Sequence, residues 1–290
     1  MSFRAAWPVV LPLALLAVIA AASLAEPLVG HILGASPATV DLLDRFAGPS
    51  AAHPLGSDEL GRDMLLRLLE GGRVSLTIGI AAALAAAVLG TAVGLVAGYL
   101  GGWADRVLMR LTDGVIALPL LPLLIVLAAL DLGKIGVSHA LADSPEIGIV
   151  RIVVLTVLVS WTTAARLVRG ATLVTRSRDF VRAAQSLGAG VRHILWRHIL
   201  PDVMAPLVVA TTLSVGDIIL LESVLSFLGL GVQPPLASWG SMLSNAEELI
   251  SSAPLLAIYP GAMIFLTVIA CNLLGDALLQ RFDPRDPARG

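Results

Sequence analysis

The sequence predicts an all-α integral membrane protein with six transmembrane helices, and three observations support this fold class. First, 57% of the 290 residues are hydrophobic and only 14% are charged, whereas a soluble domain carries about 25% charged residues. Second, the mean hydropathy of +0.89 is too high for a water-soluble globule of this length. Third, six apolar windows are each long enough to cross about 30 Å of hydrocarbon, which takes about 20 helical residues.

The six windows follow one another along the chain, with polar segments between them. The third contains Pro119 and Pro122, which we expect to kink its helix without ending it, because neighbouring helices can satisfy the freed backbone groups. The first ends near Ser23-Leu24-Ala25, which resembles a signal-peptide cleavage site. Its apolar run exceeds the roughly 7–15 residues of a signal core, so we favour a retained helix. The windows are Trp7–Leu28, Val74–Leu100, Val107–Leu130, Ile147–Val168, Val203–Leu228 and Leu255–Leu279.

The distribution of basic residues predicts that both termini lie in the cytoplasm. With the N-terminus inside, thirteen arginines fall on the cytoplasmic side and six basic residues on the other, which satisfies the positive-inside rule. The outer side then receives the polar segments 31–73, 131–146 and 229–254. The cytoplasmic arginines are Arg4, Arg106, Arg110, Arg166, Arg169, Arg176, Arg178, Arg182, Arg192, Arg197, Arg281, Arg285 and Arg289; the outer residues are Arg45, Arg62, Arg67, Arg73, Lys134 and Arg151.

A polar, arginine-rich stretch at Arg176–Pro201 interrupts the apolar pattern and has the pattern of two short amphipathic helices. Ser177 or Asp179 is expected to cap the first helix, and Gly188 suits the left-handed conformation that ends it. Pro201 is placed to open the next membrane helix. The expected apolar faces are Phe180, Ala183, Ala184 and Leu187, then Val191, Ile194, Leu195 and His198. The stretch is either a cytoplasmic docking element or a connector lying on anionic lipid, and the two glycines at the turn favour docking.

This stretch resembles the EAA loop of bacterial ABC importer permeases, whose pattern is Glu-Ala-Ala, three residues, Gly, and a spacer that ends near Ile-x-Leu-Pro. The matching positions are Ala183, Ala184, Gly188, Leu200 and Pro201. Two positions depart from the pattern: Arg182 replaces the glutamate, and His198 occupies the isoleucine position. The first departure reverses a charge, so any salt bridge that the glutamate makes in the family is not expected here.

The resemblance extends over most of the chain. The chain is similar to the "C" type subunit of the dipeptide/oligopeptide/nickel permease subfamily. The segments that carry it are His53–Asp63, Gly98–Asp105, Leu225–Pro235, Ser238–Gly240, Asn272–Asp276 and Asp283–Arg285. The resemblance implies the transmembrane domain of an ABC type I importer, which forms half of a pathway for di- or oligopeptides or related solutes. Nickel chelates, glutathione and opines are the alternative cargoes in the same family.

The resemblance also implies partners and a location. The family pairs two different permeases with two cytoplasmic ATPases and an external solute-binding protein, in the bacterial inner membrane. The EAA helices act as coupling helices that sit in a cleft of the ATPase. We expect an N-terminal helix with an external segment at 1–72, a five-helix permease core at 73–280 and a cytoplasmic tail at 281–290.

The chain is not expected to be an enzyme or to hold a cofactor of its own. Its only lysine, Lys134, lies in an external loop without the Gly-rich sequence that cradles ATP phosphates. ATP and magnesium are therefore expected in the partner ATPases. The histidines lack ligand spacing, and His193 and His198, five residues apart, should not share a helix face, so no metal site is predicted. Cys271 stands alone, which excludes an intrachain disulfide.

Carboxyl groups inside apolar windows are functional candidates by default. Asp217 and Glu222 in the fifth window are candidates for the translocation path, and Glu222 is the stronger one because it precedes a Leu-Ser-Phe-Leu-Gly-Leu-Gly run that should approach the external face. For Glu222, lining of the path and bracing of helices are equal alternatives. For Asp113 and Asp276 we favour bracing. The same carboxylates would suit a rival function, a proton-coupled secondary transporter; a membrane scaffold without transport is the second rival.

Two further groups of residues have alternative interpretations. Gly90, Gly94 and Gly98 form a small-residue face that we expect to pack within the chain rather than at a dimer seam. The external charged cluster Asp58, Glu59, Arg62 and Asp63 either braces the permeases or meets the binding protein, or is surface charge beside a helix cap at Ser57.

Overall fold

The computed structural model describes residues 7–130, 133, 138, 144–246 and 250–282, and within them every regular element is a helix. The single β-type pairing among these residues is an isolated bridge between Ser57 and Asp63. The all-α class is therefore confirmed. The predictions that concern Arg4, Lys134 and the tail beyond Phe282 lie outside the described residues.

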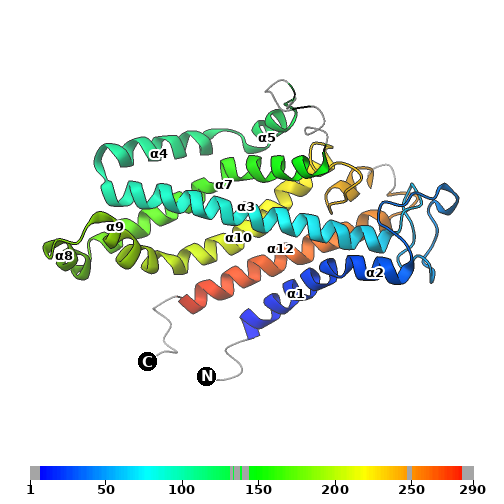
Figure 1. Ribbon diagram of the computed structural model, residues 1–290, viewed down its shortest axis with the longest axis horizontal. Coiled ribbons are helices and arrows are strands. Elements are labelled where there is room, and N and C mark those ends of the chain that lie inside the picture. Colours follow the sequence, from blue (N-terminus) through cyan, green and yellow to red (C-terminus); the bar gives the residue numbers. More distant parts are fainter. Residues whose placement is uncertain (1–6, 131–132, 134–137, 139–143, 247–249, 283–290) are drawn as a thin grey trace.

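Five of the six predicted spans are long, continuous helices that run side by side along the bundle (Figure 1). Four of them extend beyond the predicted windows, because polar residues at either end continue the helix past the apolar run. These helices are α1 (Trp7–Leu24), α3 (Met64–Leu100), α7 (Pro145–Arg176), α10 (Leu200–Phe227) and α12 (Leu255–Phe282).

The third predicted span is broken rather than kinked, so that expectation was wrong. Helix α4 (Gly102–Ala117) ends before Pro119, and α5 (Leu120–Ala128) leaves it at 85°. Leu118 has an extended backbone, with φ −76° and ψ 138°, because the ring of a following proline disfavours the helical region. Proline also lacks the N–H that a continuing helix needs. Pro119 thus separates two helices whose apolar composition alone suggests a single span.

The first two spans also differ from their predicted limits. Helix α1 ends at Leu24, and the chain enters a second helix, α2 (Glu26–Leu33), which ends at Gly34 with φ +64°. Helix α3 begins at Met64, so the domain boundary predicted between residues 72 and 73 falls inside it. Its cap is Asp63, whose carboxylate accepts from the Leu66 N–H at 2.8 Å. The alternative of a helix cap at Ser57 is therefore excluded.

Helices α3 and α7 form the most extensive helix–helix contact among the described residues, through the small-residue face predicted from the sequence. A Cβ atom on Gly90 would lie 2.5 Å from the Trp161 carbonyl oxygen, and one on Gly94 would lie 2.6 Å from that of Ala165. Gly98 continues this face toward the end of α3. Missing side chains let two backbones approach closely, which is how small residues hold membrane helices together. The prediction of packing within the chain is confirmed.

The bundle carries non-spanning structure at both ends (Figure 1). At one end lie α8 (Asp179–Ser186) and α9 (Val191–Ile194), which connect α7 to α10. At the opposite end lie the segment before α3, with the short helix η2 (Leu42–Asp44), and the loop between α10 and α12, with η5 (Ser241–Leu243). The two ends therefore offer separate surfaces to the two sides of a membrane.

Replacing Gly94 with leucine will lower the thermal stability of the protein, because the new side chain meets the α7 backbone. Overpacking of this kind costs about 1–3 kcal/mol. Fluorescence-monitored unfolding in detergent measures the effect. The matched control is Gly170→Ala on α7, where an added Cβ would have nothing within 4 Å and alanine favours the helix. Equal melting temperatures for Gly94→Leu and the unmodified protein would contradict the α3–α7 packing.

Candidate functional site

Helix α8 is attached to the bundle by Val181, and its predicted apolar face points elsewhere. Val181 is fully buried and packs in a core with Tyr99 and Ile199. By contrast, Leu187 is 88% exposed and Phe180 is 45% exposed. Phe180 and Leu187 belong to the apolar face predicted for α8, but that face does not pack on the bundle. It remains open at the end of the molecule.

The start and end of α8 differ in how well they were predicted. The cap residue is Arg178, without a capping side chain, and the Ser177 hydroxyl instead donates backward to the Val174 carbonyl at 2.7 Å. Both predicted caps, Ser177 and Asp179, were therefore wrong. Gly188 has φ +81°, so the left-handed end is confirmed.

The predicted second short helix is the first part of a long one. Helix α9 runs through a π-helical turn, η4 (Leu195–Ile199), directly into α10, giving one helix from Val191 to Phe227. Pro201 lies in the first turn of α10, as predicted. A π-turn holds one more residue than an α-turn. It brings the rings of His193 and His198 to a centroid distance of 5.7 Å, so the expectation that they do not share a helix face was wrong.

Polar contacts connect α8 and its flanks to three spanning helices. The Gln185 amide donates to the Tyr99 hydroxyl at the end of α3 at 3.5 Å. The Arg176 guanidinium lies 5.5 Å from the centroid of the Tyr99 ring, within the range of a cation–π contact. Arg178 pairs with Asp202 of α10 at 3.3 Å. Helix α8 and its flanking residues are therefore in contact with α3, α7 and α10.

The residues matched to the EAA pattern lie together around this loop. Arg182 and Ala183 are exposed, Ala184 is half-buried, and Gly188 is exposed at the turn. Leu200 and Pro201 open α10, one half-buried and one exposed. The Arg182 guanidinium forms no ion pair with a carboxylate of the described residues, so its charge faces outward.

Glu222 lies in a closed network that joins α10 to α3. It is fully buried, and its carboxylate accepts from the Ser226 hydroxyl at 2.6 Å and from the Ser75 hydroxyl at 3.0 Å. The Trp239 backbone N–H in turn donates to the Ser75 oxygen at 3.2 Å. Buried polar groups that are fully hydrogen-bonded fix one arrangement of the elements that supply them. This geometry matches the bracing alternative for Glu222.

The loop that follows α10 is held against α3 around this network. Trp239 is fully buried, and its indole N–H donates to the Leu68 carbonyl at 3.0 Å. Gly71 and Gly72 leave the space for its ring, since a Cβ on either would lie 3.1 or 2.9 Å from ring atoms. The Ala237 N–H donates to Glu70 at 3.3 Å. No pattern in the sequence predicts that this loop enters the bundle.

Asp217 lies in a different environment from Glu222, although both were predicted on one path. Asp217 is exposed and lines a cavity of about 540 Å³ between the α4–α5 break, α7 and α10. Five residues of α-helix turn by about 140°, which places the two carboxylates on different sides of α10. Leu118 and Leu120, on either side of Pro119, line the same cavity. The break in the third span therefore shapes this cavity.

The other carboxylates of the spans lie away from this cavity. Asp113 pairs with Arg166 of α7 at 2.6 Å, and Asp105 accepts from Arg169 at 2.7 Å, so two ion pairs join α4 to α7. This arrangement matches the bracing interpretation of Asp113. Asp276 is exposed on α12. Within the described residues, no group of three His, Cys, Asp or Glu side chains is arranged to hold a metal ion.

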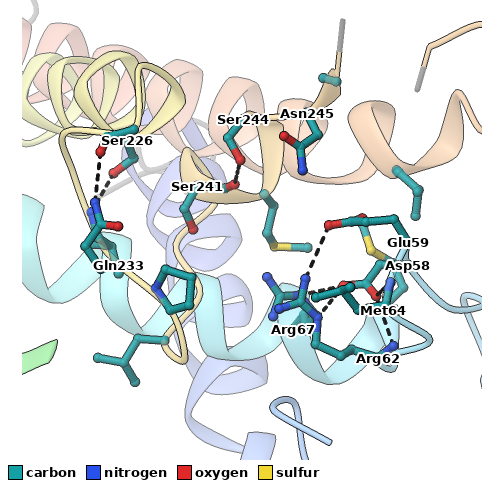
Figure 2. Close-up of a pocket in the computed structure, with 18 residues that line it drawn as sticks. Asp58, Glu59, Arg62, Met64, Arg67, Ser226, Gln233, Ser241, Ser244 and Asn245 are labelled. Atoms are coloured by element: carbon teal, nitrogen blue, oxygen red, sulfur yellow. Dashed lines mark hydrogen bonds and ion pairs between the residues drawn. The ribbon is translucent and has the colours of Figure 1, made fainter. Parts of the chain in front are cut away.

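The charged cluster before α3 is folded into the structure. Asp58 is 4% exposed, and its carboxylate accepts from Arg62 at 2.7 Å and pairs with Arg67 at 3.2 Å. Figure 2 shows these side chains beside a cavity of about 250 Å³, together with Ser241, Ser244 and Asn245 from the loop after α10. The interpretation as ordinary surface charge was therefore wrong for Asp58, Arg62 and Asp63, which are buried.

Replacing Glu222 with alanine will destabilise the protein and loosen the loop after α10. The change leaves the Ser75 and Ser226 hydroxyls without their buried acceptor, which costs about 1–3 kcal/mol, and the lost packing adds to this. A lower melting temperature and faster proteolysis between residues 229 and 246 are expected. Ser244→Ala is the control, because that hydroxyl is exposed and bonds only within its own turn. Unchanged proteolysis of Glu222→Ala would argue against the network.

Comparisons with known proteins identify the family. Residues 90–285 match the model of the binding-protein-dependent transport system inner membrane component. A protein of Brucella ovis named as a peptide permease is 39% identical over 251 residues, which covers 86% of this chain and 78% of the relative. The glutathione transport system permease protein of Pectobacterium atrosepticum is 44% identical over 238 residues, covering 82% of this chain and 74% of that protein.

These matches cover far more of the chain than the loop at 176–201, and they weigh against the two rival functions, a proton-coupled carrier and a scaffold. The family works with ATPase and binding-protein partners, and its members are transport subunits rather than enzymes. The chain belongs to the family of binding-protein-dependent transport system inner membrane components, and it is a multi-pass permease subunit of an ABC importer.

Proposed function

We propose that this chain forms half of the translocation pathway of an ATP-driven importer for peptides or related solutes such as glutathione. The names of its relatives, a peptide permease and a glutathione permease, support this cargo class. We further propose that a second, different permease supplies the other half. Both termini and α8 would face the cytoplasm, which the arginine-rich composition around α8 supports through the positive-inside rule.

The observation that carries this proposal is the exposed apolar surface at the α8 end of the bundle. Leu187 is 88% exposed and Trp196 is 67% exposed, and Phe180 adds a half-exposed ring. An apolar surface of this kind on a polar segment marks a contact with a protein or with the membrane, and the family's ATPase partners favour a protein contact. We assign it to the cleft of an ATPase subunit, with Arg182, Arg192 and Arg197 around its edge.

The structure of the loop suits the transmission of movement. Val181 holds α8 in the core that contains Tyr99, and Gln185 and Arg176 contact the same tyrosine. When two bound ATP molecules close the ATPases, a rigid α8 would carry that movement into α3, α7 and α10. ATP and magnesium would be bound by the ATPases, because the only lysine of this chain has no phosphate-binding loop around it.

Of the two residues predicted on the solute path, we retain Asp217. It lines the cavity beside the α4–α5 break, whereas Glu222 is enclosed between α3 and α10. In secondary transporters, solute sites lie beside discontinuous helices. The cavity beside Pro119 likewise borders the break between α4 and α5.

Transport assays with purified components test the function. The chain, its companion permease and both ATPases are reconstituted in liposomes, and the cognate binding protein is added with a labelled dipeptide or with glutathione. Uptake is expected only with ATP and with both ATPases present. Uptake driven by a proton gradient in liposomes without ATPases would overturn the proposal.

Replacing Gly188 with valine will separate ATP hydrolysis from uptake. Gly188 has φ +81°, a conformation that a β-branched residue resists at a cost of about 1–3 kcal/mol, so the end of α8 must rearrange. We expect uptake to fall about tenfold or more while the ATPases still hydrolyse ATP.

Gly190→Ala is the matched control for this variant. Gly190 has φ −67°, and an added Cβ meets nothing within 4 Å, so alanine should be tolerated with uptake near that of the unmodified transporter. Normal uptake by Gly188→Val would refute the role of this turn in coupling.

A further inference from the structure

Asp217 lies inside the apolar, membrane-spanning stretch of α10. It is ten residues before Phe227, the last residue of α10. At 1.5 Å per residue, this separation is about 15 Å, or half of a hydrocarbon core about 30 Å thick. A carboxylate at this depth is costly against lipid and is found where it faces a cavity or a polar partner.

The described residues provide a cavity beside Asp217 but no basic partner for it. No arginine, lysine or histidine of the described residues pairs with Asp217. The two arginines that follow the cavity-lining residues of α7 form other ion pairs: Arg166 pairs with Asp113, and Arg169 pairs with Asp105. The cavity is open on one side, and its volume of about 540 Å³ is far larger than the roughly 10–15 Å³ that one water molecule requires. Asp217 therefore faces a space that can hold water and a solute.

The polar lining of the cavity offers hydrogen-bond acceptors. The Ser214 hydroxyl donates to the Ala210 carbonyl at 2.9 Å, and the Thr162 hydroxyl donates to the Val159 carbonyl at 2.9 Å. A hydroxyl whose hydrogen is used within its own helix has only lone pairs left for a ligand. Ser160 and Thr163 add two more oxygen atoms, and none of the lining residues is basic.

We propose that Asp217 binds the positively charged amino group of the solute during passage, so that this permease itself selects for cargo that carries an ammonium group. An ammonium has three N–H donors and no acceptor, and the cavity offers a carboxylate and hydroxyl oxygens. The inference rests on the proposed function, because it takes this cavity as part of the path. Under this proposal, the permease selects cargo by its charge, in addition to the selection that the binding protein makes.

The first experiment tests, without any cargo, whether the Asp217 carboxylate attracts cations into the cavity. Ser160→Cys places a thiol in the cavity lining, in a chain whose buried Cys271 is changed to alanine. The complete transporter is treated in membranes with a cationic and an anionic methanethiosulfonate reagent, and labelling of this chain is followed by mass. Relative to a free thiol, the cationic reagent should react about tenfold faster or more, and Asp217→Asn should remove this preference.

Asp276→Asn is the matched control, because it removes a carboxylate from a spanning helix that does not line the cavity. It should leave the preference unchanged. If neither reagent reaches the thiol of the Ser160→Cys variant, another protein surface closes the cavity, and the proposal is overturned. A preference for the cationic reagent that persists in the Asp217→Asn variant would also overturn the proposal.

The second experiment measures selection during transport. The uptake of a lysine-containing dipeptide is compared with that of a glutamate-containing dipeptide, each at saturating binding protein. Asp217→Asn should lower the ratio of cationic to anionic uptake at least about fivefold, and Asp217→Glu should restore it. Equal loss of both uptakes in Asp217→Asn, with no rescue by glutamate, would mark a structural role and overturn the proposal.

The two experiments also separate this inference from the function on which it rests. If the unmodified transporter imports neither dipeptide nor glutathione, the proposed cargo is wrong, but the thiol experiment still decides whether Asp217 forms a cation site. If import occurs and the thiol shows no charge preference, the function stands and the cation site is wrong.

Discussion

The glycine surfaces of α3 allow its backbone to approach its neighbours closely, and the positions of the other parts depend on this approach. Gly90, Gly94 and Gly98 face α7, whereas Gly79 faces α10, where an added Cβ would lie 2.6 Å from the Ile219 side chain. In lipid, helices gain little from burying apolar surface, so close packing of small residues supplies much of the attraction. A change of α3 at any of these positions would therefore move several helices.

The same helix links the two ends of the molecule. At one end, Tyr99 contacts Gln185 and Arg176 around α8. At the other, Gly71 and Gly72 make room for Trp239, and Ser75 joins Glu222 to the loop after α10. A helix of 37 residues spans about 55 Å at 1.5 Å per residue. One continuous helix thus contacts both the α8 region and the loop after α10.

The sequence predicts the fold class, the spans and the left-handed turn at Gly188, because hydropathy and backbone freedom are local properties of the chain. It fails where several elements meet. The presence of a proline does not determine whether a helix kinks or breaks. At Pro119 the helix breaks, and the break shapes a cavity. The buried face of α8 depends on Val181 meeting a core built by other helices. Glu222 and Asp217 look alike in one window, but the 3.6-residue period already places them on different sides of α10.

The π-turn between α9 and α10 has a consequence for how such a chain can change. One additional residue in a helix rotates everything after it by about 100°. The turn at Leu195–Ile199 therefore sets the angular phase between the segment that carries α8 and the face of α10 that carries Asp217. Insertion or loss of a single residue there would change this phase, and because Trp196 and Arg197 lie in the turn itself, it would also alter the proposed docking surface. The proposed cargo site and the proposed ATPase contact thus both depend on one turn of a continuous helix.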